Sequence, residues 1–246
     1  MQFLLRITFL WVFVFTVSAV EAQQRLVLST LESTPNGRIG AAILKRAYAE
    51  IGIEIEIYQT SGQRGLMLSS AGAVDGEVVR FGVVGDLHPT LRRVDVPIVR
   101  FAMTVFVKEN AVSTVRLDNL AALRVGHLTG TVKLVELTQG FSDVWRASSN
   151  SELFEMLAAE RLDAVISDTV AGRIALGRLG LSGITELKPP LVQDNLYHFL
   201  HEKHSHLVPE IGRVLQRMTQ TGELRATIEA EIKSMTGHEA LGSVDN

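Results

Sequence analysis

Two stretches of the sequence combine residue types that suit the binding of a small charged ligand. In the first, Thr129-Gly130-Thr131 stands between a segment that predicts a strand and a segment that predicts a helix. Free backbone amides and the positive end of the helix favour an anionic group at such a position. Gly130 allows close approach to the backbone, and Thr131 can add a hydroxyl. The alternative is an ordinary helix N-cap with a turn glycine.

The second stretch ends in Asp168, which follows the apolar residues 164–166 and Ser167. This pattern puts Asp168 at the C-terminal end of a buried strand, where open α/β sheets bind their ligands. A carboxylate there can pair with the ammonium group of a ligand that has lost its water. The alternative is an N-cap for the helix predicted from Thr169 onward, and the two roles are compatible.

Arg80 and Glu32 are further candidates for ligand contacts. Arg80 ends the predicted strand 76–80, where strand periodicity puts it on one face with Gly76 and Val78. Its guanidinium either reaches solvent or points into a cleft, where it could bind a carboxylate through two hydrogen bonds. Glu32 lies in a polar loop and could contact a cationic part of a ligand. The alternative for Glu32 is a solvated loop acid.

Four histidines near the C-terminus raise the question of a metal site: His198, His201, His204 and His206. Neutral imidazoles bind zinc and copper. Their spacing is not that of an HExxH motif, and no set of acids or thiolates accompanies them. We therefore predict no metal site and no cofactor.

Composition excludes several classes of protein. The chain has 246 residues, 46% of them apolar, a formal net charge of −3 and no cysteine. Its apolar fraction is too high for a disordered chain, and its near-balanced charge argues against a nucleic-acid-binding surface. Without cysteine there is no disulfide framework, thiol nucleophile or thiolate zinc site.

Strand and helix patterns alternate along the chain and would position these residues. Residues 26–28 form an apolar run, 44–51 repeat with helical spacing before Gly52, and 53–57 alternate as in a half-buried strand. This β-α-β order is typical of a parallel sheet with crossover helices. Further strands are predicted at 74–80, 105–108, 124–126, 164–167 and 196–200, and helices from Ser151, from Val170, from Pro209 to Gly222 and from Leu224.

The two ends of the chain differ from the rest. One arginine at position 6, an apolar run over 7–20 and a small residue at position 22 predict a secretory signal peptide over residues 1–22, cleaved after Ala22. Cleavage after Ala19 is the alternative. Residues 238–246 show no periodicity, and we predict a flexible tail.

Five segments, taken in order, match a set of motifs that recur together. Gly72–Arg80 is similar to a GxxD turn that leads into a strand, Val94–Pro97 to a VDFxxP run, and Leu123–Thr131 to GxxVGVxxGT; Glu160–Asp168 is similar to GxxDAVxxD with Glu160 in place of glycine, and Leu215–Gly222 to a closing helix that ends in glycine. Together they resemble the bacterial extracellular solute-binding proteins of family 3, the polar-amino-acid class of ABC-transporter binding proteins. The resemblance covers residues 25–237.

The resemblance implies a two-lobed α/β fold, the type II periplasmic-binding-protein fold, in which each lobe is a mixed sheet flanked by helices. Lobe 1 would comprise residues 23–107 plus 193–237, and lobe 2 residues 108–192. Two extended segments, 105–109 and 188–192, are the candidates for the crossings between the lobes.

The resemblance also implies site residues. The aspartate matching Asp168 takes the α-ammonium of the ligand in that family. The family's TxxR arginine, which grips the ligand carboxylate, has no clean counterpart, because residues 81–90 are an insertion-like stretch. Arg80, Arg92 and Arg93 are the possible substitutes, and we predict Arg80. The first loop also lacks the aromatic residue that the family stacks on its ligand.

The function that the resemblance implies is a periplasmic, monomeric protein that captures a small polar ligand and delivers it to an ABC permease. The ligand would be an amino acid or a related small acid or amine. One alternative is a ligand-binding sensor subunit for a membrane receptor. The other is an enzyme similar to cyclohexadienyl dehydratase, with Glu77 or Glu32 as its acid or base.

Overall fold

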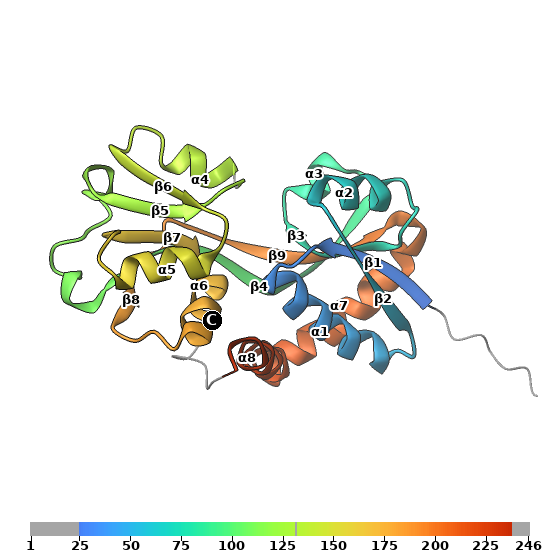
Figure 1. The fold of residues 1–246 in the computed structure, drawn as a ribbon. Helices are drawn as coiled ribbons and strands as arrows, with labels where there is room; N and C mark the ends of the chain where they lie inside the picture. The colour runs from blue at the N-terminus through green and yellow to red at the C-terminus, as the bar shows by residue number, and fades with distance from the viewer. Residues whose placement is uncertain (1–24, 131, 238–246) are drawn as a thin grey trace, which may run out of the picture.

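The chain folds into two lobes that share one mixed β-sheet (Figure 1). The computed structural model describes residues 25–130 and 132–237. The predicted signal peptide (1–22), the predicted tail (238–246) and Thr131 lie outside the described residues.

The sheet runs through both lobes in the order β2-β1-β3-β9-β4-β7-β5-β6, with β8 paired to β4. β1, β2 and β3 belong to lobe 1, and β5 to β8 belong to lobe 2. The described strands are β1 (Arg25–Leu31), β2 (Glu54–Thr60), β3 (Gly76–Phe81), β4 (Leu91–Lys108), β5 (Arg124–Leu128), β6 (Asp143–Ala147), β7 (Ala164–Asp168), β8 (Ile184–Glu186) and β9 (Val192–His201).

Helices flank the sheet in both lobes. Lobe 1 carries α1 (Pro35–Glu50), α2 (Gly62–Ser70), α3 (Val84–Leu87), α7 (Val208–Gln220) and α8 (Glu223–Thr236), and lobe 2 carries α4 (Val132–Leu137), α5 (Asn150–Ala158) and α6 (Thr169–Leu179). Short 3-10 turns cover 109–111, 120–122 and 202–207. Over the ranges that the structure describes, none of these helices is both long and apolar enough to cross a bilayer.

The predicted β-α-β unit is confirmed. β1 and β2 are parallel, and α1 connects them. The helix starts where Thr34 caps it, its Oγ1 accepting from the amide of Gly37 at 3.3 Å, and Pro35 occupies the first turn. It ends before Gly52, whose φ of +73° terminates the helix with a left-handed residue. The predicted Gly222 break between α7 and α8 is confirmed by its φ of +79°.

The chain passes between the lobes in the middle of two long antiparallel strands, β4 and β9 (Figure 1). Their pairing extends from Leu91 opposite His201 to Met103 opposite Val192. β7 of lobe 2 already pairs with β4 from Met103 onward, a few residues before the predicted boundary at 107. The strand predicted at 105–108 is thus only the end of β4, because charged residues and Pro97 obscure the pattern of its first half.

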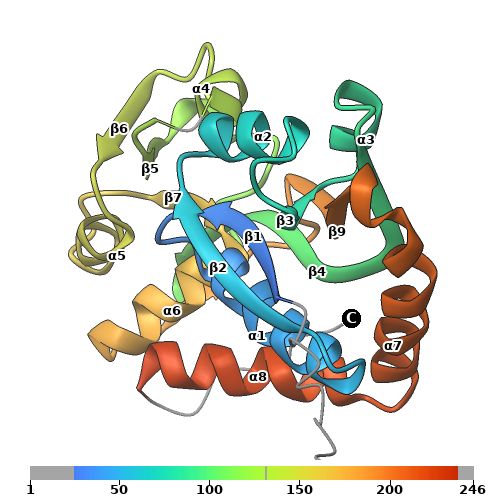
Figure 2. The same ribbon diagram turned by 90° about the vertical axis from the view of Figure 1, so that its right-hand side faces the viewer.

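Each lobe has its own apolar core. In lobe 1, Tyr48 of α1, Ile211 of α7 and Ile232 of α8 pack with the strands. In lobe 2, α5 and α6 cover one face of the sheet and the segment after β4 covers the other. Val170 and Ile174 of α6 belong to the lobe 1 core, since α6 lies beside α8 (Figure 2). Lobe 2 is therefore attached to lobe 1 by this helix as well as by the two crossing strands.

Candidate functional site

The predicted site residues lie at strand ends on either side of the crossing. In lobe 1, β3 ends at Phe81, which pairs with Leu196 of β9. Leu196 pairs in turn with Val99 of β4 on its other side. In lobe 2, β7 ends at Asp168, opposite Met103 of β4. Val99 and Met103 are four residues apart, about 13 Å along a strand. β3 and β7 are also three strand positions apart across the sheet, about 14 Å, so the two strand ends face each other across the crossing at roughly 20 Å along the sheet.

Arg80 forms a buried ion pair with Glu77 of the same strand. Arg80 Nε donates to Glu77 Oε2 at 2.8 Å, and Ser69 Oγ of α2 donates to Glu77 Oε1 at 2.7 Å. The Glu77 side chain is fully buried, and that of Arg80 is 9% exposed. Arg80 Nη2 donates to the carbonyl of Gly62 at 3.2 Å. This network fixes the plane of the guanidinium.

The face of β3 on which Arg80 lies differs from the prediction. Regular alternation would have put Arg80 with Gly76 and Val78, and opposite to Glu77. Instead, Glu77 is paired with Phe199 and Arg80 with Tyr197, so β3 holds one extra residue between the two pairs. Such a β-bulge turns the residues that follow it, and here it brings Arg80 onto the face of Glu77.

The guanidinium retains one edge for a ligand. Among the hydrogen bonds of the described residues, none uses Arg80 Nη1. A Cβ on Gly65 would lie 2.8 Å from Arg80 Nη2 and 2.9 Å from Ser29 Oγ, so only glycine leaves these groups their room. Ser29 Oγ is buried and has no partner in the described part of the chain. A donor that lies unused next to a cation suits an anionic group.

Asp168 has the capping role that the sequence left open. Its Oδ1 accepts from the amide of Ala171 at 2.8 Å, which caps α6. Its Oδ2 accepts from Nδ2 of Asn36, in the first turn of α1, at 3.2 Å. Burial raises the pKa of the Asp168 carboxyl, although the hydrogen bonds from Ala171 and Asn36 oppose the rise. A cationic ligand group would stabilise this carboxylate in its charged form.

Thr129 and Gly130 lie at the end of β5, exposed to solvent. Thr129 Oγ1 and its backbone amide both contact the carbonyl of Ala147, each at 2.9 Å. Gly130 has a φ of +83°, which places it in the left-handed region and turns the chain before α4. The loop is thus held to the end of β6, and a Cβ on Gly130 would meet no atom within 4 Å.

The other predicted residues lie apart from this arrangement. Glu32 is exposed, and its backbone amide donates to the carbonyl of Thr60 at 3.1 Å. Arg92 pairs with Glu202 at 3.0 Å. Arg93 pairs with Asp95 at 2.7 Å and lies over the ring of Tyr197. Of the three candidate arginines, Arg80 is the one at a strand end beside the crossing.

Two residues near the site escaped the sequence reasoning. Asn36 lies in the first turn of α1, where Pro35 before it is a sign of a helix start. Phe81 follows Arg80, is 37% exposed, and packs edge-on against Phe101 with 5.2 Å between ring centroids. It provides an aromatic surface that the first loop lacks.

The histidines have structural partners. His198 is fully buried; its Nδ1 donates to the carbonyl of Glu77 at 2.7 Å, and its Nε2 accepts from the hydroxyl of Tyr48 at 2.8 Å. His204 contacts Asp75 at 2.7 Å. Within the described ranges, no group of three or more His, Cys, Asp or Glu side chains is arranged to hold a metal ion.

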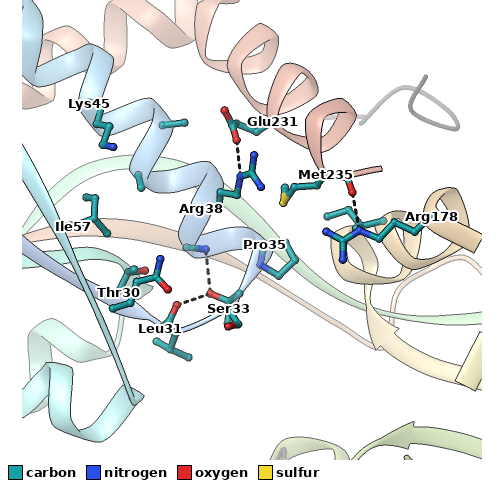
Figure 3. Close-up of a pocket in the computed structure, with 16 residues that line it drawn as sticks. Thr30, Leu31, Ser33, Pro35, Arg38, Lys45, Ile57, Arg178, Glu231 and Met235 are labelled. Carbon is teal, nitrogen blue, oxygen red and sulfur yellow. Dashed lines mark hydrogen bonds and ion pairs between the residues drawn. The ribbon is translucent and has the colours of Figure 1, made fainter. Parts of the chain in front are cut away.

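A hollow of about 560 Å³ lies beside α1, next to the start of the helix, with α6 and α8 on its other side (Figure 3). Arg38 pairs with Glu231 there at 3.1 Å, and Arg178 donates to the carbonyl of Met235 at 2.8 Å. None of the predicted ligand-binding residues lines this hollow. The hollow lies next to the end of β1, with Thr30 and Leu31 in its lining, and Pro35 and Gly37 on either side of Asn36 also line it.

The chain is similar in fold to several solved structures. No family model and no curated protein matches the chain. Among solved structures, an ancestral cationic amino acid solute-binding protein, AncCDT-1, is similar with a TM-score of 0.67 at 17% identity, over 85% of this chain and 95% of that one. The amino acid ABC transporter substrate-binding protein AbpA from Streptococcus pneumoniae, bound to L-arginine, has a TM-score of 0.60 at 16% identity, over 89% and 99% of the two chains.

A third structure, the GluR0 ligand-binding core in complex with L-glutamate, has a TM-score of 0.67 at 13% identity, over 86% of this chain and 99% of that one. Each of the three is covered almost completely, so both lobes and the crossing are shared. At such low identity, the likeness concerns the fold and not the ligand. The chain has the two-lobed type II periplasmic-binding fold of the amino acid solute-binding proteins, as predicted.

Proposed function

We propose that the protein is a solute-binding protein that captures a small ligand carrying both an anionic and a cationic group, an amino acid or a related compound. The observation that carries this proposal is the placement of Arg80 and Asp168 at strand ends of opposite lobes, on either side of the crossing. A ligand that contacts both residues stabilises the closed arrangement of the lobes.

Each end of the ligand would have a defined partner. The carboxylate binds the Nη1 edge of Arg80, because Nε and Nη2 are held by Glu77 and Gly62. The ammonium group binds Asp168, whose carboxyl pKa is raised by burial, so a cationic partner would stabilise its charged form. In the loop of Thr129, Gly130 and Thr131, the amides of Gly130 and Thr131 would donate to the anionic part from lobe 2, while Thr129 holds the loop to the carbonyl of Ala147. We do not assign Glu32 a contact, since it is a solvated acid in the structure.

The biological setting is part of the proposal. The predicted signal peptide over residues 1–22 directs the chain to the periplasm, where it would act as a monomer and pass its ligand to an ABC permease. The fold supports this, since AbpA is a substrate-binding protein of an amino acid ABC transporter. A ligand-binding sensor subunit for a membrane receptor is the second candidate, since the same fold can bind the ligand in either role.

An enzymatic role has weaker support. AncCDT-1 is a precursor of cyclohexadienyl dehydratase, so the fold is compatible with that chemistry. A dehydratase needs an acid or base that faces its substrate. Glu77 is fully buried and engaged by Ser69 and Arg80, while Glu32 is a solvated loop residue. Neither candidate fits the role, and we propose binding without turnover.

The proposal can be tested with a thermal-shift screen of the chain from Gln23 onward against the standard L-amino acids. A ligand that binds only the folded state adds about 2.7 kcal/mol of stability at a hundred times its Kd. We expect one amino acid or a small group to raise the Tm, and the shift to disappear in Arg80→Gln and in Asp168→Asn. Arg92→Gln is the matched control and should keep the shift. If Arg92→Gln loses binding and Arg80→Gln retains it, the assignment of the site is wrong.

A further inference from the structure

One hydrogen bond joins the two lobes at the candidate site. Asn36 lies in the first turn of α1 in lobe 1, and Asp168 ends β7 in lobe 2. Their side chains meet where Asn36 Nδ2 donates to Asp168 Oδ2 at 3.2 Å. The two residues are 132 positions apart in sequence, so this contact exists only in the assembled two-lobed chain.

The other atom of the same amide is left without a partner. Asn36 Oδ1 is buried and accepts no hydrogen bond from the described residues. The orientation of the amide follows from chemistry, because a carboxylate requires the donor side to face it. Asn36 Nδ2 therefore donates to Asp168, while Asn36 Oδ1 accepts no hydrogen bond from the described residues. Buried polar atoms are rarely left in this way.

Asp168 needs this donor only while the site holds no cation. Its Oδ1 keeps the amide of Ala171, the cap of α6, whatever happens at Oδ2. An ammonium group is also a donor, and unlike the Asn36 amide it carries a positive charge that attracts the buried carboxylate directly. The ligand group and the Asn36 amide compete for the same oxygen, and the charged donor has the advantage.

We infer that Asn36 is an interlobe latch, which holds Asp168 in the empty protein and is displaced by the cationic group of the ligand. The displacement rests on the proposed function, while the latch itself rests on the observed contact. α6 transmits the change, because Asp168 caps it and its residues Val170 and Ile174 pack into the lobe 1 core. Release of Asn36 would remove this side-chain link between the lobes, while the packing of α6 on lobe 1 and the bond from Arg178 to the carbonyl of Met235 remain.

The latch can be tested without any ligand. Because the chain contains no cysteine, two introduced cysteines can be labelled specifically. Spin labels on Met67→Cys of α2 and Val135→Cys of α4, both exposed positions in opposite lobes, report the interlobe distance by double electron–electron resonance. We expect Asn36→Ala to broaden the distribution of distances. Arg38→Ala is the control, because Arg38 contacts Glu231 and Ser234 within lobe 1. An unchanged distribution in Asn36→Ala would overturn the latch.

The displacement is tested with the L-amino acid that gives the largest thermal shift, and with its 2-hydroxy analogue, which lacks the ammonium group. Asn36→Ala should bind the amino acid about tenfold more tightly, since it removes a competing hydrogen bond to a charged group. Its affinity for the analogue should not change. Equal or weaker binding of the amino acid would contradict displacement. If no amino acid binds the unaltered protein, the proposed function and the displacement both fail, and the spin-label experiment alone decides on the latch.

Discussion

Glu77 and Arg80 form an ion pair on one face of β3, although they are three positions apart and a regular strand would place them on opposite faces. The extra residue between the two positions makes this pairing possible. Glu77 neutralises the guanidinium inside lobe 1 and fixes its orientation. The ion pair thus holds in place the guanidinium that would bind the ligand carboxylate. Its contribution to the free energy of unfolding can be measured separately from ligand binding.

Removal of the buried carboxylate should destabilise the protein strongly. Glu77→Ala leaves the nearly buried charge of Arg80 uncompensated, which costs about 3–5 kcal/mol in comparable pairs. The free energy of unfolding, measured with urea, gives the loss. The double variant Glu77→Leu with Arg80→Met is the control, and it should recover much of the stability because no unpaired charge remains. Equal losses in the single and the double variant would show that packing, not charge, stabilises this region.

Two glycine substitutions should change stability in opposite directions. A Cβ at Gly76 would lie 2.1 Å from the carbonyl oxygen of Phe199, so Gly76→Ala must push β3 away from β9. We expect a loss of about 1–3 kcal/mol, as in other overpacked sites. At Gly212, inside α7, the nearest atom would be Val94 Cγ1 at 3.7 Å, and Gly212→Ala should gain about 0.5–1 kcal/mol. Thermal unfolding of both variants checks the signs, and a stabilised Gly76→Ala would contradict the β3–β9 register.

Stability should fall as the solution becomes acidic, in part because of one histidine. Burial lowers the pKa of His198 to about 4, whereas in the unfolded chain it has the ordinary value of about 6.5. At a pH above the pKa in the unfolded chain, His198 is neutral in both the folded and the unfolded state, and its contribution to the free energy of unfolding is complete. Between these two values the unfolded chain takes up the proton more readily, so stability declines as the pH drops, by roughly 3 kcal/mol in total.

The matched variant for this prediction is His198→Gln, which removes the titrating group and keeps hydrogen-bonding capacity for Tyr48 and Glu77. Urea unfolding over this pH range should give a shallower slope for the variant than for the unaltered chain. Identical slopes would mean that His198 contributes nothing to the pH dependence in this range.

The two roles of Asp168 can be separated by two substitutions. Asp168→Ala removes the cap of α6, which costs about 1 kcal/mol, and also removes the negative charge. Asp168→Asn keeps a good capping residue and removes only the charge. Both variants should lose binding of an amino acid in calorimetry, while only the alanine variant loses stability. Retained binding in Asp168→Asn would remove the charge of Asp168 from the recognition of the ligand.

Local periodicity in the sequence was enough to predict the elements whose signals are contiguous. The unit β1-α1-β2, the two C-terminal helices and the strand before Asp168 are confirmed, because each rests on apolar spacing and on a cap or a glycine at its end. The short elements α3 and β8 were not predicted, since runs of four and three residues are too brief to show a period.

The site was predictable only in part. Arg80 and Asp168 were identified from their positions after apolar strands, and their use by a ligand stays a prediction. The pairing of Arg80 with Glu77 depends on a bulge, and that of Asp168 with Asn36 depends on the packing of the two lobes. Neither leaves a periodic signal in the sequence, because both follow from tertiary structure. Likewise the charges and Pro97 in β4 obscured a strand that only its pairing with β9 explains.

The course of the chain through β4 and β9 has a consequence for the order of folding. All strands of lobe 2 lie between these two, whereas lobe 1 needs β9 to pair with β3 and bring His198 to the carbonyl of Glu77, 121 residues earlier in the sequence. Long-range pairings of this kind close late, since the intervening loop must be ordered first. Lobe 2 should therefore acquire protection from hydrogen exchange before lobe 1 in refolding, and a chain cut just before α7 should retain a folded lobe 2 beside an incomplete lobe 1.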